Sequence, residues 1–123
     1  MKGFIAAGAS GALLSVMLGA LATHSLKQQL TAEALAAFTT AVQYQMYHSL
    51  ALLLACVLPL RNRWVGVAKI CFVIGTLLFS GSIYGLTLAQ WTWLGPVTPL
   101  GGLTLMIGWL ALIVASLGDA SNG

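Results

Sequence analysis

The sequence predicts an all-α fold, an integral membrane four-helix bundle, from its composition and from the placement of its charges. Hydrophobic residues make up 59% of the 123 residues and charged residues 6%, against roughly 25% charged in an average soluble domain. The five basic and two acidic side chains leave three uncharged stretches, 3–26, 34–60 and 70–118. Because about 20 apolar residues cross a bilayer as a helix, the first two stretches fit one crossing each and the third fits two. We therefore expect one four-span membrane domain over residues 1–123.

The first span is expected at 4–23, with small residues along one side. At about 100° per residue, the small side chains fall within about 120° of arc: Gly8, Gly11, Ala12, Ser15, Gly19 and Ala22. Membrane helices pack closely through small residues, so this face is predicted to be a helix–helix seam. Lys2, the apolar run and Ala20-Leu21-Ala22 imitate a signal peptide. The run of about 19 residues exceeds the usual 7–15 of such a segment, so we expect it to be retained as a span.

The second span is expected at 38–58, as part of a helix that starts near Ala32. Thr31 is a suitable N-cap, and Glu33 favours the positive end of the helix dipole. Pro59 and the turn at Arg61-Asn62-Arg63 end the helix.

The third and fourth spans are expected at 65–89 and 100–117. In the third span the smaller side chains share one side: Cys71, Gly75, Ser82 and Gly85. Trp91 and Trp93 mark a membrane surface, and prolines make the connecting hairpin. In the fourth span a packing face lies within about 80° of arc and contains Gly101, Thr104, Gly108, Ala111 and Ala115.

The positive charges predict the topology. Lys2, Arg61, Arg63 and Lys69 fall on one side of the four spans, and Lys27 falls alone on the other. Basic residues are enriched in cytoplasmic loops. We therefore expect both termini in the cytoplasm, in a bacterial plasma (inner) membrane.

The second span carries the polar residues that are candidates for a site. One face of about 140° contains Thr40, Gln43, Tyr44, Tyr47 and His48. Because polar groups are costly in hydrocarbon, we expect this face to point into the bundle or into a wet cavity. The opposite face is expected to meet lipid: Val42, Met46, Leu50, Leu53 and Val57.

His48 has two interpretations, and the structural one is favoured. The functional interpretation makes it a proton-handling or ligand-binding group. The structural interpretation makes it a neutral, hydrogen-bonded histidine that fixes helix register. His24, at the end of the first span, is expected to be interfacial. The third-span residues Ser80, Ser82 and Tyr84 form a possible polar site, although buried hydroxyls usually bond back to their helix or across to a neighbour.

Several classes of function lack support in the sequence. No basic run with interleaved aromatics favours nucleic acid. Cys56 and Cys71 have no metal-ligand spacing, and we expect neither a metal site, a disulfide nor a cofactor. A hydrolytic triad and a phosphate loop are unsupported because their motifs do not occur. We therefore do not expect an enzyme.

The motifs resemble one known family. They are Gly19-Ala20 with His24, the runs Thr40–Ala51 and Gly75–Tyr84, and Val97–Gly102 followed by Gly108-Trp109. In order and spacing the chain is similar to domain-of-unknown-function family 423, the YgdD-like small inner-membrane proteins, with eukaryotic transmembrane protein 256-like relatives. The chain departs from the pattern at Ala22-Thr23 and lacks a strongly basic tail. The resemblance implies four membrane helices and an uncleaved first span, and it implies no reaction.

Two functions are therefore expected from different classes. The first is a non-enzymatic helical bundle that binds membrane lipid or another membrane partner. A homo-oligomer is expected with it, because the small-residue faces of spans one and four exceed the needs of a minimal bundle. The alternative is a small transporter or channel with a polar pathway around His48. The small-molecule ligand is not specified by the sequence.

Overall fold

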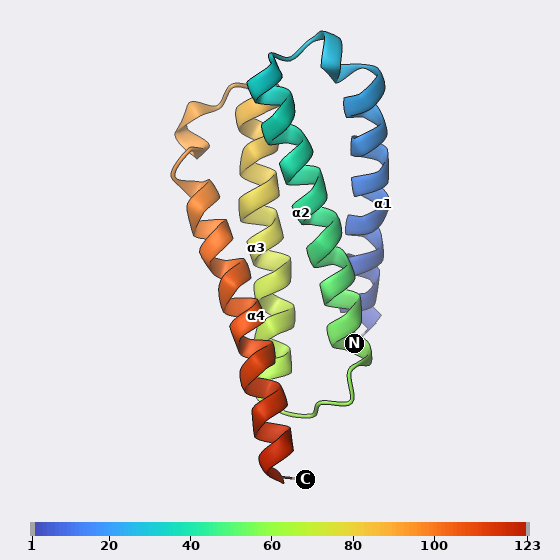
Figure 1. Cartoon of the computed structure of the whole chain (residues 1–123), viewed down its shortest axis with the longest axis vertical. Helices are drawn as coiled ribbons and strands as arrows, with labels where there is room; N and C mark the ends of the chain where they lie inside the picture. Colours follow the sequence, from blue (N-terminus) through green and yellow to red (C-terminus); the bar gives the residue numbers. More distant parts are fainter. Residues whose placement is uncertain (1, 123) are drawn as a thin grey trace.

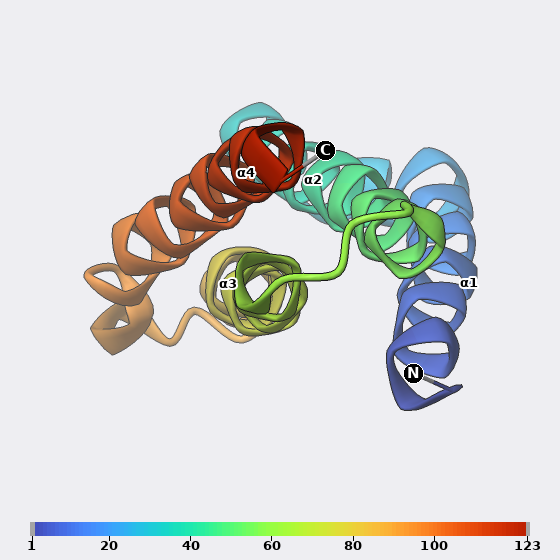
Figure 2. The ribbon, with the colours of Figure 1, turned by 90° about the horizontal axis from the view of Figure 1, so that it is seen from below.

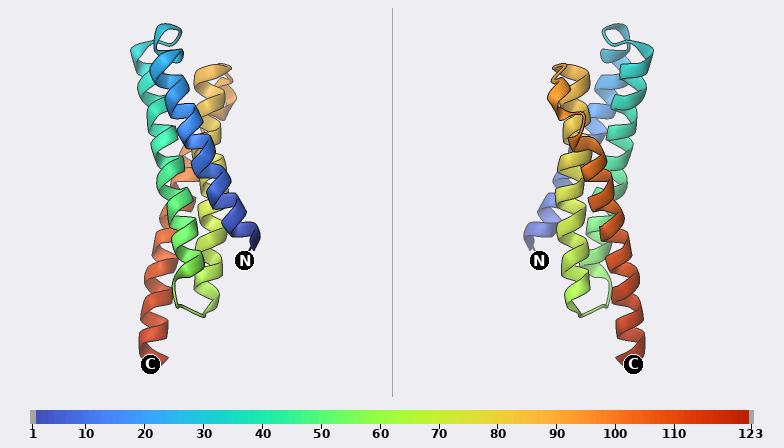
Figure 3. Two further views of the ribbon diagram at one scale, coloured as in Figure 1. Left: turned by 90° about the vertical axis from the view of Figure 1, so that its right-hand side faces the viewer. Right: turned by 90° about the vertical axis from the view of Figure 1, so that its left-hand side faces the viewer.

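The computed structural model describes residues 2–122, and side chains as far as residue 118. Four long helices run along one axis (Figure 1): α1 (Lys2–His24), α2 (Ala32–Val57), α3 (Arg63–Leu88) and α4 (Val97–Asn122). Short 3₁₀ segments, η1 (Leu26–Gln28) and η2 (Thr92–Leu94), lie in the first and third connections. Figure 3 shows these two connections at one end of the bundle and the α2–α3 loop at the other.

Helix boundaries follow the capping residues. The Thr31 hydroxyl accepts a hydrogen bond of 3.1 Å from the Ala34 backbone N–H and starts α2 where the sequence predicts. The Asn62 side-chain oxygen accepts one of 3.1 Å from the Trp64 N–H and starts α3. Helix α4 begins at Val97, three residues earlier than expected. Pro99 is tolerated there because N–H groups of a first turn have no partner within the helix.

Three segments are long and apolar enough to cross a membrane, namely Lys2–His24, Arg63–Leu88 and Thr92–Gly118. Helix α2 has a comparable length of 26 residues. Its polar residues lower its hydropathy and set it apart from the other three. The fold is therefore all-helical, with four helices of which three have the character of membrane spans.

Consecutive helices pack against each other, α1 on α2, α2 on α3 and α3 on α4. Seen along the axis in Figure 2, α1 and α3 stand apart, with α2 next to both. The core between α2, α3 and α4 contains Ala51, Leu52, Ala68, Phe72, Leu105 and Ala111. A second cluster near the η1 end contains Ala22, Leu26 and Phe38.

Small residues make the helix seams, as the sequence predicts. A Cβ atom on Gly8 would come within 3.0 Å of Leu53, and one on Gly108 within 2.8 Å of Phe72. A Cβ on Gly101 would overlap the backbone of Phe79. The small faces of α1 and α4 are thus occupied by neighbouring helices of the same chain. They are not surplus, and the basis on which a homo-oligomer was expected is wrong.

Candidate functional site

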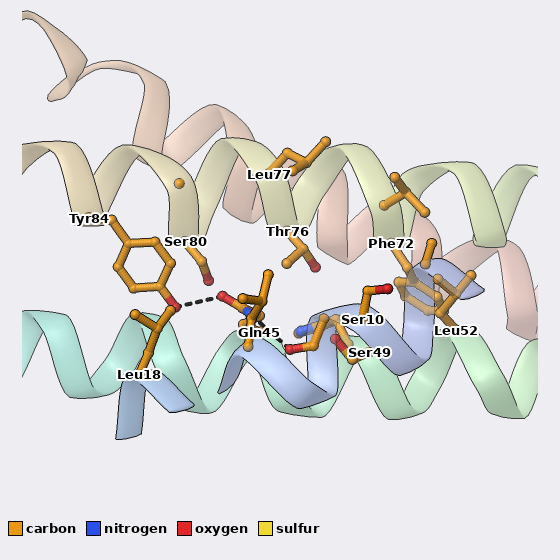
Figure 4. A pocket seen from close by; sticks show the side chains of 16 residues that line it. Ser10, Leu18, Gln45, Ser49, Leu52, Phe72, Thr76, Leu77, Ser80 and Tyr84 are labelled. Carbon is orange, nitrogen blue, oxygen red and sulfur yellow. Dashed lines mark hydrogen bonds between the residues drawn. The ribbon is translucent and has the colours of Figure 1, made fainter. Parts of the chain in front are cut away.

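Gln45 joins three helices through one side-chain amide. Its Nε2 donates a hydrogen bond of 2.8 Å to the Gly11 carbonyl on α1. Its Oε1 accepts one of 2.6 Å from the Tyr84 hydroxyl on α3. The Gly11 carbonyl also accepts a bond from Ser15, which points along the same seam. Figure 4 shows Gln45 between the ribbons, with Tyr84 reaching it from above.

Further hydroxyls link α3 to its other neighbours. Ser80 is buried and donates a bond of 2.7 Å to the Ala41 carbonyl on α2. Ser82 lies 2.6 Å from the Thr98 hydroxyl on α4 and 3.0 Å from the Phe79 carbonyl. Ser82 therefore bonds both back to its own helix and across to another. This is the structural role that its residue type favours in a membrane helix.

His48 has a partner at each ring nitrogen. The Trp109 indole N–H on α4 lies 3.0 Å from Nε2. Because an indole can only donate, Nε2 must accept. Nδ1, which lies 2.8 Å from the Tyr44 carbonyl, therefore carries the proton. The arrangement holds His48 as a neutral Nδ1–H tautomer that connects α2 to α4.

A cavity of about 420 Å³ lies beside this network, between α1, α2 and α3. Leu14 and Leu77 lie at its rim and are 50% and 69% exposed, so it opens at the molecular surface between α1 and α3. Phe72 and Leu52 line its inner wall together with Gln45 (Figure 4). None of its lining residues is charged. The size falls within the ~300–1,000 Å³ of typical small-molecule sites.

The cavity wall also carries a polar atom without a partner. Thr76 of α3 lines the cavity, and its hydroxyl oxygen is buried. It is the only buried side-chain oxygen or nitrogen in the described part of the chain that has no hydrogen-bond partner. Such groups are rare because leaving one unbonded costs about 1–3 kcal/mol. The wall of the cavity therefore contains one polar group that the protein itself leaves unsatisfied.

The predicted orientation of the polar face of α2 is wrong for four of its five residues. Thr40, Gln43 and Tyr47 are exposed on the outside of the bundle, whereas His48 is buried. Tyr44 is also exposed, at 39%, although its ring stacks on Phe79 with the ring centroids 4.9 Å apart. The expected lipid-facing residues Val42, Met46 and Leu53 are half-buried instead.

The physical reason is that α2 packs through a different stripe. Its buried side contains Phe38, Ala41, Gln45, His48, Leu52 and Ala55. Small residues in this stripe let α1 and α3 approach, and Gln45 bonds to both of them. His24 is exposed at the end of α1, apart from the cavity.

Sequence reasoning missed Gln45, Thr76 and Trp109. The signal for Gln45 was the alternating spacing of three and four residues from Phe38 to Ala55, which is typical of a packed helix face. Thr76 and Trp109 had no comparable signal, because their roles depend on which helices become neighbours. Within residues 2–118, no group of His, Cys, Asp or Glu is arranged to hold a metal ion.

The relatives of the chain are membrane proteins. A family model described as "Protein of unknown function (DUF423)" matches residues 18–102. The chain belongs to this family. The UPF0382 membrane protein YwdK of Bacillus subtilis is 40% identical over 120 residues, covering 95% of this chain and 98% of its own. The fission yeast (Schizosaccharomyces pombe) UPF0382 membrane protein C1782.12c is 40% identical over 110 residues, covering 83% and 91%.

The resemblance expected from the motifs is thus confirmed. A further family member, the UPF0382 membrane protein SSP2132 of Staphylococcus saprophyticus, is 38% identical over 94% of this chain and 98% of its own. No solved structure matches the chain. The family is one of unknown function, so the chemistry of the cavity has to be argued from its residues.

Proposed function

We propose that this protein is a non-enzymatic membrane bundle that binds an uncharged lipid in the cavity between α1 and α3. The observation that carries the proposal is the cavity itself, which opens between α1 and α3 and has no charged lining residue, together with the unpartnered Thr76 hydroxyl in its wall. A ligand with an aliphatic chain and one hydroxyl or carbonyl group would satisfy both features. A phosphate or a carboxylate is disfavoured because no Lys or Arg side chain lines the cavity and both ring nitrogens of His48 already have partners.

The proposal includes four membrane spans, with α2 as the fourth. Helix α2 lies against α1 and α3 along the same axis (Figure 1), and it is as long as α3, with 26 residues in each helix. Its most polar groups are partly compensated inside the bundle, since Gln45, His48 and the Ala41 carbonyl all have partners there. A helix in this position spans the same membrane that α1 and α3 span.

The proposed orientation has both termini in the cytoplasm of a bacterial plasma membrane. The α2–α3 loop with Arg61, and Arg63 at the start of α3, lie at one end of the bundle, whereas the η1 segment with Lys27 lies at the other (Figure 3). The excess of basic residues on the side of Lys2, Arg61 and Arg63 supports this orientation.

A role in binding, without a chemical step, fits the hydrogen-bonding of the polar residues. Gln45 and Tyr84 bond to each other, and Ser80 bonds to the backbone. Glu33 lies exposed in the first turn of α2, at the end where it favours the dipole. The alternative function, transport past His48, has less support because both ring nitrogens of His48 are occupied.

A cavity-filling substitution tests the proposal. Gly81 lines the cavity, and a Cβ atom there would meet nothing within 4 Å. Gly66 of the same helix has equal space but is not a lining residue. In native mass spectrometry from lipid nanodiscs, the wild type and Gly66→Leu should retain an uncharged lipid that Gly81→Leu has lost. Equal retention by all three proteins, or by none, would contradict the proposal.

A further inference from the structure

The outer surface of α2 carries a stripe of exposed residues at alternating spacings of four and three. We name it the outer stripe of α2, and it consists of Ala36, Thr40, Gln43, Tyr47, Leu50, Leu54 and Val57. The spacing is that of the contact positions in a two-stranded coiled coil. No other helix of the described chain covers this side of α2, because α1 and α3 occupy the opposite side.

Beside the Tyr47 hydroxyl, which also has no hydrogen-bond partner among the described residues, Gln43 is the residue of this stripe that suits lipid least. It lies near the middle of α2, which spans residues 32–57. The Thr40 hydroxyl is satisfied by the Ala36 carbonyl at 3.1 Å. In the described part of the chain, the Gln43 amide has no hydrogen-bond partner. Facing hydrocarbon, such an amide would cost several kcal/mol, on the order of 2–7.

The outward face of α4 provides the contrast. Its exposed residues repeat the same spacing and are all apolar: Leu103, Met106, Leu110, Ile113 and Leu117. That face is compatible with lipid because it presents no polar group. The outer stripe of α2 therefore differs from an ordinary lipid-facing surface by its polar groups, above all the central amide of Gln43, and not by its spacing.

We propose that the outer stripe of α2 is the interface with a second copy of this chain. Copies inserted the same way place their α2 helices parallel about a two-fold axis along the membrane normal. Gln43 then meets Gln43 of the second copy. An amide donates and accepts, so the pair forms two complementary hydrogen bonds. A polar residue at one contact position also fixes register, and Leu50, Leu54 and Val57 continue the contact.

This inference rests on α2 crossing the membrane, as proposed above, and not on lipid binding. It places self-association on a face different from the glycine seams, which the bundle uses internally. A different membrane protein bound to the same stripe is the competing outcome, and the test has to separate the two.

Cysteine cross-linking in lipid vesicles tests the inference. Cys56 and Cys71 are first replaced by alanine. Val57→Cys then places one thiol at the end of the outer stripe, and Leu117→Cys places one on α4 as a matched control. Both positions are highly exposed, at 74% and 65%. Val57 is the last residue of α2 and Leu117 belongs to the last turns of α4, and these two helix ends lie toward the same end of the bundle (Figure 1). Oxidation should link Val57→Cys to itself at dilutions in lipid at which Leu117→Cys stays monomeric.

A second comparison isolates the amide. Gln43→Leu in the Val57→Cys background should weaken self-association roughly fivefold to tenfold, the effect of losing two interhelical hydrogen bonds in a membrane. Thr40→Val should leave association unchanged, because the Thr40 hydroxyl bonds within its own helix.

Three results would overturn the inference: equal cross-linking at both thiols, no weakening by Gln43→Leu, or capture of a different protein at Val57→Cys without self-linking. Gly81→Leu, which fills the cavity, should not change cross-linking at residue 57. Failure of lipid binding and failure of the interface are thereby distinguished. Labelling of opposite ends of α2 with an impermeant thiol reagent checks separately that α2 crosses the membrane.

Discussion

The Tyr84 hydroxyl donates a hydrogen bond of 2.6 Å to the side-chain oxygen of Gln45, and the same amide donates to the Gly11 carbonyl. One side chain of α2 thus joins α1 to α3, which otherwise stand apart (Figure 2). The bond spans the helices that enclose the cavity. Gln45 therefore positions the cavity walls as well as stabilising the bundle.

Replacing Gln45 by leucine is expected to destabilise the bundle by about 1–3 kcal/mol, because the Tyr84 hydroxyl loses its partner in a half-buried site. Reversible unfolding in dilute mixed micelles measures the change. Thr40→Val is the control, since Thr40 is exposed and its hydroxyl bonds only to the Ala36 carbonyl of the same helix. An equal loss of stability in both variants would show that Gln45 has no special role.

Adjacent glycines at the start of α4 should respond differently to alanine. A Cβ on Gly101 overlaps the Phe79 backbone, whereas one on Gly102 has its nearest neighbour at 3.8 Å. Gly101→Ala should lower the free energy of unfolding by about 1–3 kcal/mol, because α3 and α4 must move apart. The free energy of unfolding of Gly102→Ala should stay within about 1 kcal/mol of the wild-type value. The same unfolding assay measures both variants. Equal stabilities of Gly101→Ala and Gly102→Ala would contradict the packing of α4 on α3.

His48 is expected to be a neutral Nδ1–H tautomer in the membrane at neutral pH. The physical reason is the Trp109 N–H, which requires an acceptor at Nε2. Nitrogen-15 NMR of the protein in bilayers, with labelled histidine, reports the protonated nitrogen directly. His24, exposed at the end of α1, is the internal reference. Trp109→Phe should change the His48 signal and leave that of His24. A charged or Nε2–H imidazole in the wild type would be incompatible with the arrangement.

Thiol labelling tests the orientation. Lys27 lies in the η1 connection and Arg61 in the α2–α3 loop, and these two connections are at opposite ends of the bundle (Figure 1). In intact cells an impermeant maleimide should label Lys27→Cys and spare Arg61→Cys until the membrane is opened. The reverse pattern would invert the proposed topology, and labelling of both in intact cells would exclude it.

Charge placement and small-residue faces predicted the helices and the seams of α1 and α4 because both are local properties of the chain. The orientation of α2 escaped prediction for a physical reason. Between Thr39 and Ser49 most residues are polar, so polarity does not say which side is buried. The buried stripe is decided by whether Gln43 or Gln45 finds partners on neighbouring helices. Likewise, the Thr76 hydroxyl is buried without a hydrogen-bond partner only because of how α1 and α3 pack beside α2, which the sequence of α3 alone does not show.

The most direct test of the central claim is photo-cross-linking with an uncharged lipid, a long-chain alcohol that carries a diazirine. Mass spectrometry of the labelled protein in nanodiscs locates the adducts. Binding in the cavity predicts adducts concentrated on Leu14, Leu18 and Leu77. Excess unlabelled alcohol should remove them, and Gly81→Leu should abolish them. Adducts spread evenly over the outward faces, including Leu103 and Leu110 of α4, and insensitive to competition, would contradict a lipid-binding cavity.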